Sequence, residues 1–246
     1  VISDTVIDIA HGAFEGCRLL TRIQIPESVE RIGDFAFERC SSLEQITISA
    51  NVEKIGKKAF QGCEALERII VSEDNSFYSD GGCGVLYDKS ETTLIRVPQG
   101  TRELDLPLGL IDIAPDAFEG CTKLDCILCT DEQVSILKEA ISGCVPRPVI
   151  HIVDGPIAYA EDKSSLYVID EDVEALSVLP GVKTIDGDVF KNCTKLTALE
   201  IPESVTYIDP DAFRSCPKLT IHAPTGSYAE AYCRGKGIVF VPTEKD

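Results

Sequence analysis

The sequence predicts an α/β repeat solenoid, a right-handed coil in which short strands stack into a parallel sheet. The prediction rests on three observations. A segment ending in A-F-x-x-C recurs, with Phe14, Phe37 and Phe60 spaced 23 residues apart. After A-F-x-x-C comes an L-x-x-I-x-I segment, and then a V-x-x-I segment leads into the next A-F-x-x-C. A period of this length is typical of stacked repeats, because one copy cannot cover its own apolar side.

Seven copies keep the same phase, and one of them is degenerate because Ile replaces Phe. The large apolar position is occupied by Phe14, Phe37, Phe60, Phe118, Ile141, Phe190 and Phe213. The Cys position three residues later is occupied by Cys17, Cys40, Cys63, Cys121, Cys144, Cys193 and Cys216. We therefore expect a buried column of Phe rings with a row of Cys side chains beside it.

Each copy contains two kinds of element. In L-x-x-I-x-I, as in Leu20, Ile23 and Ile25, the alternation sends two side chains to one face of a short strand. In V-x-x-I-x-x-x-A-F-x-x-C, apolar spacings of three and four favour a helical or 3-10 turn on the convex side. Gly33 and Gly56 stand where the chain is expected to bend sharply.

Two stretches interrupt the repeat and each predicts a β-hairpin. In residues 74–104, Val85–Tyr87 and Leu94–Val97 flank a polar turn, and Tyr159 in residues 154–180 aligns with Tyr87. These insertions either continue the stack, which we favour, or project as binding elements. We expect one solenoid over 1–246, with repeats at 1–73, 105–153 (the last one degenerate) and 181–221, hairpins at 74–104 and 154–180, and a cap at 222–246.

The last segment has the pattern of a terminal cap. Ser227 is placed to cap a short helix that carries Ala229, Ala231 and Tyr232, and a strand at 238–241 follows. Such a cap seals the open end of a stacked core. The first copy starts in mid-pattern at Val6 and Ile9, so we expect an upstream segment.

The repeat resembles that of the BspA-like (Treponema-type) leucine-rich repeat family of bacterial cell-surface proteins. The resemblance is carried by A-F-x-x-C at residues 36–40, 59–63, 117–121 and 212–216, and by I-P-E-S-V at 25–29 and 201–205. It covers nearly the whole chain. It implies a curved solenoid with a concave parallel sheet and a cell-surface or secreted location. Some members are associated with adhesion to host proteins or other cells.

The charge balance excludes some partners. Asp and Glu outnumber Lys and Arg 41 to 23, giving a net charge of −18 that repels phosphate backbones and anionic lipid. No apolar run approaches the roughly 18 residues that a membrane span needs. We therefore expect no nucleic-acid partner and no membrane insertion by this segment. We expect a monomer whose partner is a protein, such as a host extracellular protein or another cell surface.

The phased Cys residues are expected to be free thiols. Neighbouring coils lie about 5 Å apart, but their parallel, inward side chains leave the Cβ atoms too far apart for easy bridging. Cys126 and Cys129 form a lone C-x-x-C inside a strand, without the second ligand pair that zinc sites usually have.

No combination of residues points to catalysis. His11, His151 and His222 lie in different repeats without a nucleophile at a recognisable spacing. The acidic pairs at 73–74 and 186–188 lack the alternating ligands of a Ca²⁺ loop, so we interpret them as solvated carboxylates. We therefore expect no enzyme, no cofactor and no metal.

The outward positions of the L-x-x-I-x-I strands are the candidate ligand-binding residues, because such proteins commonly bind on the concave sheet. They are Arg22, Gln24, Gln45, Thr47, Arg68, Ile70, Cys126, Leu128, Ala198 and Glu200. Ile70 and Leu128 flank the first insertion and either anchor a partner or pack under the hairpin. We expect a protein-binding or adhesion module. The alternative is a spacer domain without its own ligand, and an enzyme comes last.

Overall fold

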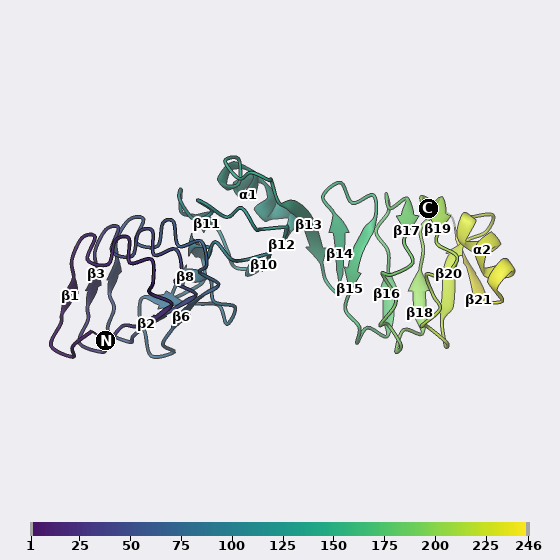
Figure 1. The fold of residues 1–246 in the computed structure, drawn as a ribbon. Helices are drawn as coiled ribbons and strands as arrows, with labels where there is room; N and C mark the ends of the chain where they lie inside the picture. Colours follow the sequence, from purple (N-terminus) through teal and green to yellow (C-terminus); the bar gives the residue numbers. More distant parts are fainter. Residues whose placement is uncertain (1, 245–246) are drawn as a thin grey trace. The chain divides into compact units, whose positions relative to one another are not determined.

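The computed structural model describes residues 2–244 and divides the chain into two compact units, residues 1–149 and 150–246 (Figure 1). Each unit is built mainly from short parallel strands that stack coil upon coil. The repeat-solenoid prediction is therefore confirmed for each unit. The expectation that one continuous solenoid runs through both units stays a prediction.

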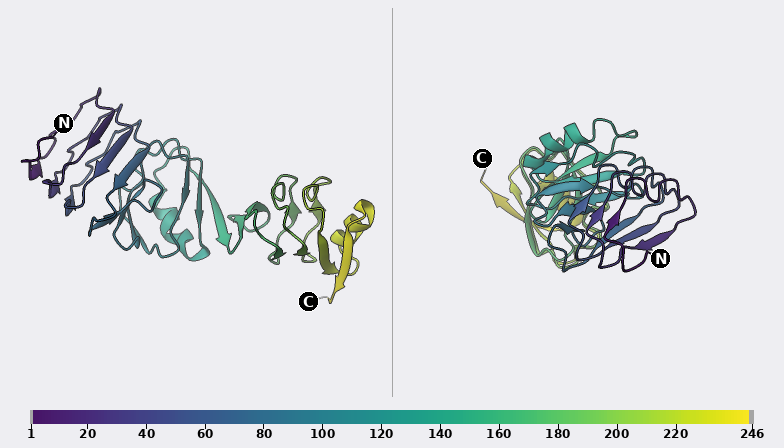
Figure 2. Two further views of the ribbon diagram at one scale, coloured as in Figure 1. Left: turned by 90° about the horizontal axis from the view of Figure 1, so that it is seen from below. Right: turned by 90° about the vertical axis from the view of Figure 1, so that its left-hand side faces the viewer.

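The first unit begins with two parallel three-stranded sheets that share one register. One sheet contains β2 (Arg22–Gln24), β4 (Gln45–Ile48) and β6 (Arg68–Val71), with Ile23, Ile46 and Ile69 aligned across it. The other contains β1 (Asp8–Ile9), β3 (Arg31–Ile32) and β5 (Lys54–Ile55). Figure 2 shows these coils lying side by side in the N-terminal part of the chain. L-x-x-I-x-I and V-x-x-I thus each supply one strand per coil.

The rest of the first unit includes the first insertion. Antiparallel pairing joins β7 (Tyr78–Ser79) to β8 (Leu86–Asp88) and β8 to β9 (Thr93–Arg96). Parallel pairing resumes between β9 and β11 (Asp112–Ile113), and between β10 (Glu103–Asp105) and β12 (Cys126–Cys129). A 3-10 turn at Asp131–Gln133 leads into α1 (Val134–Ala140).

The second unit repeats this plan. Its antiparallel part is β13 (Val149–Asp154), β14 (Ile157–Ala160) and β15 (Leu166–Ile169). Its main parallel sheet is β16 (Ala175–Ser177), β18 (Ala198–Glu200), β20 (Thr220–Pro224) and β21 (Val239–Thr243). The two-stranded sheet is β17 (Thr184–Ile185) and β19 (Tyr207–Ile208), and α2 spans Tyr228–Lys236.

The degenerate copy has the expected 3-10 turn and helix, at Asp131–Gln133 and α1, but the convex turns of the A-F-x-x-C copies differ from this form. The A-F-x-x-C segments are single hydrogen-bonded turns, in which Cys40 N donates to Phe37 O at 3.2 Å. The N–H of Phe37 instead donates to the neighbouring coil, at 2.9 Å from Ala59 O. Phe35 and Arg39 both have φ of 57°, which a right-handed helix cannot include. Backbone hydrogen bonds between neighbouring coils therefore replace the hydrogen bonds that would run along a helix.

Gly33 and Gly56 serve close packing rather than a bend. Neither has a positive φ, so the expected sharp turn is not what requires glycine there. A Cβ on Gly33 would lie 2.7 Å from His11 N and 2.8 Å from Ala10 C. Gly56 meets the backbone of Asp34 in the same way. Each glycine lets its coil approach the preceding one.

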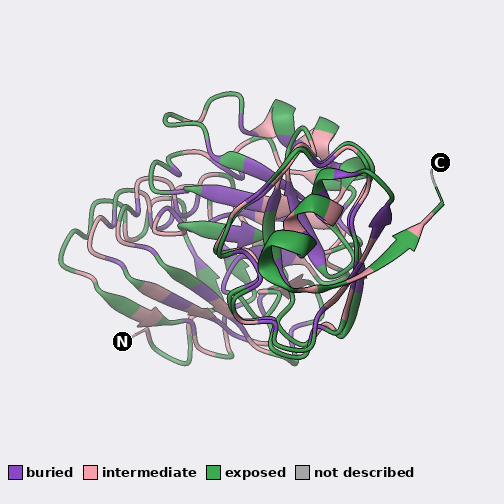
Figure 3. Ribbon diagram, turned by 90° about the vertical axis from the view of Figure 1, so that its right-hand side faces the viewer, coloured by how far each residue is buried: buried purple, intermediate pink, exposed green. Residues whose placement is uncertain are grey.

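The core contains the expected column of rings. Phe37 is fully buried and stacks between Phe14 at 5.1 Å and Phe60 at 5.8 Å, with interplanar angles of 1° and 14°. In the second unit, Phe190 and Phe213 lie 5.0 Å apart. In Figure 3, many strand residues are coloured as buried and many residues of the outer turns as exposed. Every coil therefore uses its neighbours to bury its apolar side.

The two hairpins add to the buried interior. Tyr87 and Tyr159, at the aligned positions, are 0% and 1% exposed. In the first hairpin, the Asp88 carboxylate accepts hydrogen bonds from Thr93 N at 2.7 Å and from the hydroxyls of Ser90 and Thr92. These contacts favour the interpretation that the hairpins continue the stack.

Asn75 is a buried link between coils that the sequence analysis missed. It is fully buried, and its Nδ2 donates to Ser49 O at 2.8 Å and Val52 O at 3.0 Å. Its Oδ1 accepts from the N–H groups of Phe77 and Tyr78, both at 2.8 Å. The amide thereby pairs four backbone groups where the repeat gives way to the insertion.

The C-terminal cap has the expected form. Ser227 Oγ accepts a hydrogen bond from Glu230 N, and α2 ends at Gly237 with φ of 69°. Tyr232 packs edge-on against Phe213, with ring centroids 5.8 Å apart, and β21 pairs with β20. The helix and strand therefore continue the stacking at this end of the second unit.

Candidate functional site

The outward side chains of the L-x-x-I-x-I strands, here called the strand face, form ordered rows in the first unit. On β2, β4 and β6, the register places Arg22, Gln45 and Arg68 in one row and Gln24, Thr47 and Ile70 in the next. The exposed members are Arg22, Gln24 and Arg68, and the half-buried members are Gln45, Thr47 and Ile70. Parallel pairing spaces the members of a row about 4.8 Å apart.

The first insertion borders this part of the strand face. Gly84 O accepts from Ile69 N at 2.8 Å, and Asp80 Oδ2 accepts from Val71 N at 3.1 Å. Residues 80–84 therefore cover one edge of β6, which explains why Ile70 is only half exposed. The arrangement favours partial packing of Ile70 against the insertion and leaves part of its side chain accessible.

On β10 and β12 the strand face differs from the sequence interpretation. Cys126, interpreted as an outward residue, is 8% exposed and therefore buried. Leu128 is half-buried and lies beside Asp105 in register. The sequence analysis missed Asp105 and its neighbour Glu103 because it assigned most of this strand to the insertion. The signal was present in the L-x-L-P of residues 104–107, which matches the I-x-I-P of the regular copies.

Asp105 is a strand-face residue with a perturbed pKa. Partial burial raises the pKa of Asp105, and the like charge of Glu103 raises it further. Because Asp105 lies beside the apolar Leu128, the strand face at β10 and β12 has both an acidic and an apolar group. Such a pair suits a partner with both a donor group and an apolar group.

The second unit carries its own part of the strand face. Ala198 on β18 is half-buried and Glu200 is exposed, with Glu200 Oε2 accepting from Ser177 Oγ at 2.8 Å. The row continues through β20 to Val239 and Val241 on β21, which are 62% and 38% exposed. This face is therefore polar at β18 and apolar at its edge strand.

The three His residues lie on separate coils, as expected. The His11 ring packs 5.3 Å from that of Phe35, and the His151 ring stacks on Tyr167 at 3.5 Å. His222 is on β20 beside Glu200. Among residues 2–244, no three His, Cys, Asp or Glu side chains gather as a metal would require.

Most of the phased thiols are buried and weakly acidic. Burial raises the pKa of Cys121 to about 12 and that of Cys216 to about 11. The neighbouring Cys40 thiol and then burial raise the pKa of Cys63, whose Sγ donates to Phe37 O at 3.1 Å. Cys17 differs, because it is exposed in the first described coil. The buried thiols therefore act as small apolar groups, and those of Cys40, Cys63 and Cys216 also donate to a carbonyl oxygen of the preceding coil.

No helix in the described part of the chain has the length and apolar character that spanning a bilayer demands. The helices are α1 and α2, of 7 and 9 residues. Both belong to the stacked units already described.

Comparison with known families gives one match over most of the chain. The family described as the BspA type leucine rich repeat region matches residues 1–82 and 99–220 in six copies. No protein with curated function matches the chain.

Several solved structures are similar to the chain. A leucine rich cell surface protein of Faecalibacterium prausnitzii is 27% identical over 94% of this chain, with a TM-score of 0.49. The chain spans 60% of that protein's length. The pneumococcal vaccine antigen PcpA is 17% identical over 98% of this chain and 78% of its own, with a TM-score of 0.41. A leucine rich repeat protein of T. pallidum is 21% identical over 87% of this chain and 62% of its own, with a TM-score of 0.26.

Proposed function

The chain belongs to the BspA-type leucine-rich repeat family, and from that premise we propose that its strand face binds another protein at the bacterial cell surface. The location follows the family resemblance and the name of the Faecalibacterium protein, a leucine rich cell surface protein. The partner is a protein because the chain is too acidic to attract nucleic acid or anionic lipid.

The observation that carries the proposal is the register of the strand face. Side chains from consecutive coils, such as Gln24, Thr47 and Ile70, stand in one row. The apolar side chains of the same coils and most of the phased thiols are buried. A row of fixed side chains on a sheet loses little conformational entropy on binding, which favours recognition of a protein surface.

The row is mixed in chemistry, as protein-binding surfaces generally are. Arg22 and Arg68 supply guanidinium groups on either side of Gln45, and Ile70 supplies an apolar group. Arg is common among residues that dominate binding energy. We infer that the partner presents carboxylates opposite β2 and β6 and an apolar side chain opposite Ile70.

The second candidate function is a spacer that holds another part of a longer protein. It is supported by the small amount of apolar surface on the strand face, where Ile70 and Leu128 are both half-buried. A spacer needs a stable stack and no ligand of its own.

The test begins with an array of purified host extracellular proteins probed with the labelled chain. A protein captured by the wild type is then titrated against Ile70→Asp, Leu128→Asp and a matched control, Ile111→Asp. Ile111 is an exposed apolar residue next to β11, in the other set of strands. Burying a new carboxylate opposite an apolar group costs at least about 1–3 kcal/mol, so affinity should fall about fivefold or more.

The outcomes separate the two functions. Loss of affinity in Ile70→Asp or Leu128→Asp, with Ile111→Asp unchanged, supports the strand face as the binding surface. Equal affinity of all three variants and the wild type removes this assignment. Failure of the whole array to capture any protein favours the spacer.

A further inference from the structure

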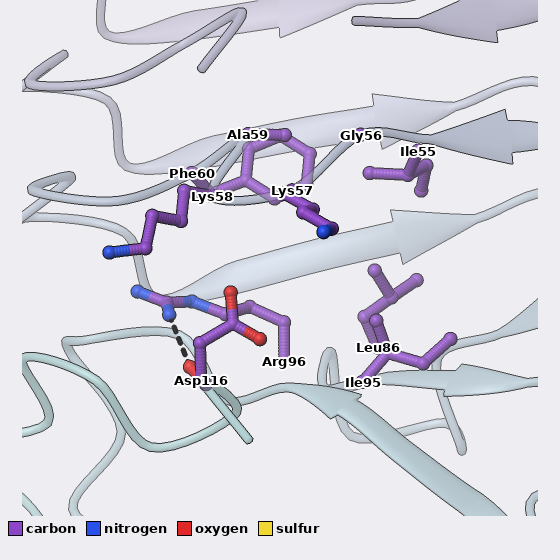
Figure 4. Close-up of a pocket in the computed structure, with 10 residues that line it drawn as sticks. All are labelled: Ile55, Gly56, Lys57, Lys58, Ala59, Phe60, Leu86, Ile95, Arg96 and Asp116. Carbon is purple, nitrogen blue, oxygen red and sulfur yellow. Dashed lines mark hydrogen bonds between the residues drawn. The ribbon is translucent and has the colours of Figure 1, made fainter. Parts of the chain in front are cut away.

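A small pocket lies where the first insertion meets the third coil of the first unit. It has a volume of about 180 Å³ and is lined in part by the turn that follows β5 (Figure 4). The turn contributes Lys57 and Lys58, and the insertion contributes Arg96 on β9. The pocket belongs to the coil turns and the insertion, and no strand-face residue lines it.

Arg96 is the buried charge of this pocket. Its residue is 5% exposed, and its guanidinium donates to Asp116 O at 2.7 Å and Glu119 O at 2.9 Å. Both acceptors are neutral carbonyl oxygens. Its Nε–H has no hydrogen-bond acceptor in the described part of the chain. The hydrogen bonds given for this buried guanidinium therefore go to neutral acceptors, although buried charges are usually stabilised by direct pairing with an opposite charge.

The other charged groups leave the pocket cationic. Lys58 Nζ lies 3.6 Å from the Glu119 carboxylate, which neutralises that ammonium. Of the remaining charged groups, Arg96 and the exposed Lys57 are positive and Asp116 is negative. The lining therefore keeps one excess positive charge. Figure 4 shows the side chains of Lys57, Lys58 and Arg96 around the same space. This excess contrasts with the net charge of −18 of the whole chain.

The opposite wall is apolar. Ile55 and Phe60 come from the third coil, and Leu86 and Ile95 come from the hairpin strands. Phe60 and Leu86 are buried, whereas Ile55 and Ile95 are partly exposed at the entrance. A ligand that satisfies both walls has an anionic end for Arg96 and a short apolar end for these side chains.

We propose that this pocket binds a carboxylate that bears a short apolar group. A carboxylate supplies the acceptor that Arg96 Nε lacks, and charge-assisted bonds to guanidinium groups are among the strong ones. The volume lies below the roughly 300 Å³ of pockets for drug-sized ligands, which restricts the apolar group to a few carbons. Free short-chain carboxylic acids and the C-terminal carboxylate of a peptide with an apolar last residue share this chemistry.

Calorimetric titration of the full chain tests the proposal with two probe pairs. The first pair is 3-methylbutanoate and its uncharged amide. The second pair is a short peptide that ends in Val, with a free or an amidated C-terminus. The variants are Lys57→Gln, which removes an exposed charge of the pocket, and Lys54→Gln, a matched control on β5 that does not line it. Arg96→Lys adds a variant that keeps the buried charge.

The expected result is saturable binding of at least one free acid and of neither amide. Lys57→Gln should weaken that binding about threefold to fivefold, and Lys54→Gln should leave it unchanged. Arg96→Lys should weaken it more, because it loses the fixed fork of donors. Binding of the peptide acid alone identifies a peptide terminus as the ligand, and binding of 3-methylbutanoate identifies a free acid.

Two results would overturn the proposal. One is equal binding of acid and amide, which shows that charge plays no part. The other is no saturable binding of either acid at about tenfold excess over a Kd of about 1 mM. Neither result bears on the strand face, because the pocket and the strand face share no residue.

Discussion

Truncation of one ring in the Phe column should destabilise the first unit strongly and locally. We choose Phe37→Ala because Phe37 is fully buried, with a ring stacked on each side at 5.1 and 5.8 Å. Phe14→Ala is the matched control, because Phe14 is half-buried and, among the described rings, it stacks on that of Phe37.

The magnitude follows from burial and ring contacts. Truncating a buried Phe to Ala costs about 3–5 kcal/mol of unfolding free energy. Within that total, each of the two ring pairs of Phe37 accounts for about 0.5–1.5 kcal/mol. Phe14 buries less area and stacks on one face, so we expect Phe14→Ala to cost about half as much.

Urea unfolding measures the total loss of unfolding free energy, and hydrogen exchange with mass spectrometry shows which residues are destabilised. Because each coil contacts mainly its neighbours, amide protection should fall at residues 13–17 and 59–63 and stay unchanged in residues 150–244. Equal destabilisation by the two truncations, or a cost below about 1 kcal/mol for Phe37→Ala, would refute a stacked column.

Three further variants test other parts of the account. Asn75→Ala leaves four backbone groups without their partners and should cost about 3 kcal/mol in urea unfolding, and a cost below about 1 kcal/mol would mean that water replaces the amide. Gly33→Ala places a Cβ 2.7 Å from a backbone nitrogen and should lower the thermal midpoint, whereas Gly109→Ala meets no heavy atom within 4 Å and should not. Asp88→Ala should cost about 1 kcal/mol near pH 7 in urea unfolding. Partial burial raises the pKa of Asp88, but its hydrogen bonds outweigh this and lower it, so its contribution is present above the unfolded value near 4 and is lost as the pH falls through the folded value. A difference from wild type that persists unchanged below pH 3 would contradict this assignment.

The repeat was predictable because it is a property of spacing. Phe37 and Phe60 are separated by the same interval as Phe14 and Phe37. This repeated spacing already implies that the rings occupy equivalent places in consecutive coils. The cap was predictable for a similar reason, because Ser227 and the following residues carry a local helix-start signal.

The convex turns were not predictable from spacing alone. Apolar intervals of three and four suit a helix, but Phe35 and Arg39 adopt positive φ because their coils bond to one another. The close approach at Gly33 likewise depends on the preceding coil. Contacts between coils, which lie about one repeat apart in the chain, decide these conformations.

The candidate site was predictable in its regular part. Gln24, Thr47 and Ile70 follow from the I-x-I alternation and lie in one row. The burial of Cys126 and the place of Asp105 on the strand face were not predicted. The insertion changes the repeat spacing, so β10, the strand that pairs with β12, was not recognised in the sequence. The pocket at Arg96 has no motif, since it forms where residues from the third coil and the insertion meet.

The stacking of the copies is tested most directly by site-resolved thiol labelling of the native chain. Cys17 and Cys83 are exposed, whereas the phased residues of the inner coils are buried, namely Cys40, Cys63, Cys121, Cys193 and Cys216. We predict rapid alkylation of the two exposed residues at pH 8 and slow alkylation of the five buried ones until the chain is denatured. Alkylation of Cys40 and Cys63 as fast as that of Cys17 would contradict the account, because it would place those thiols outside the stack.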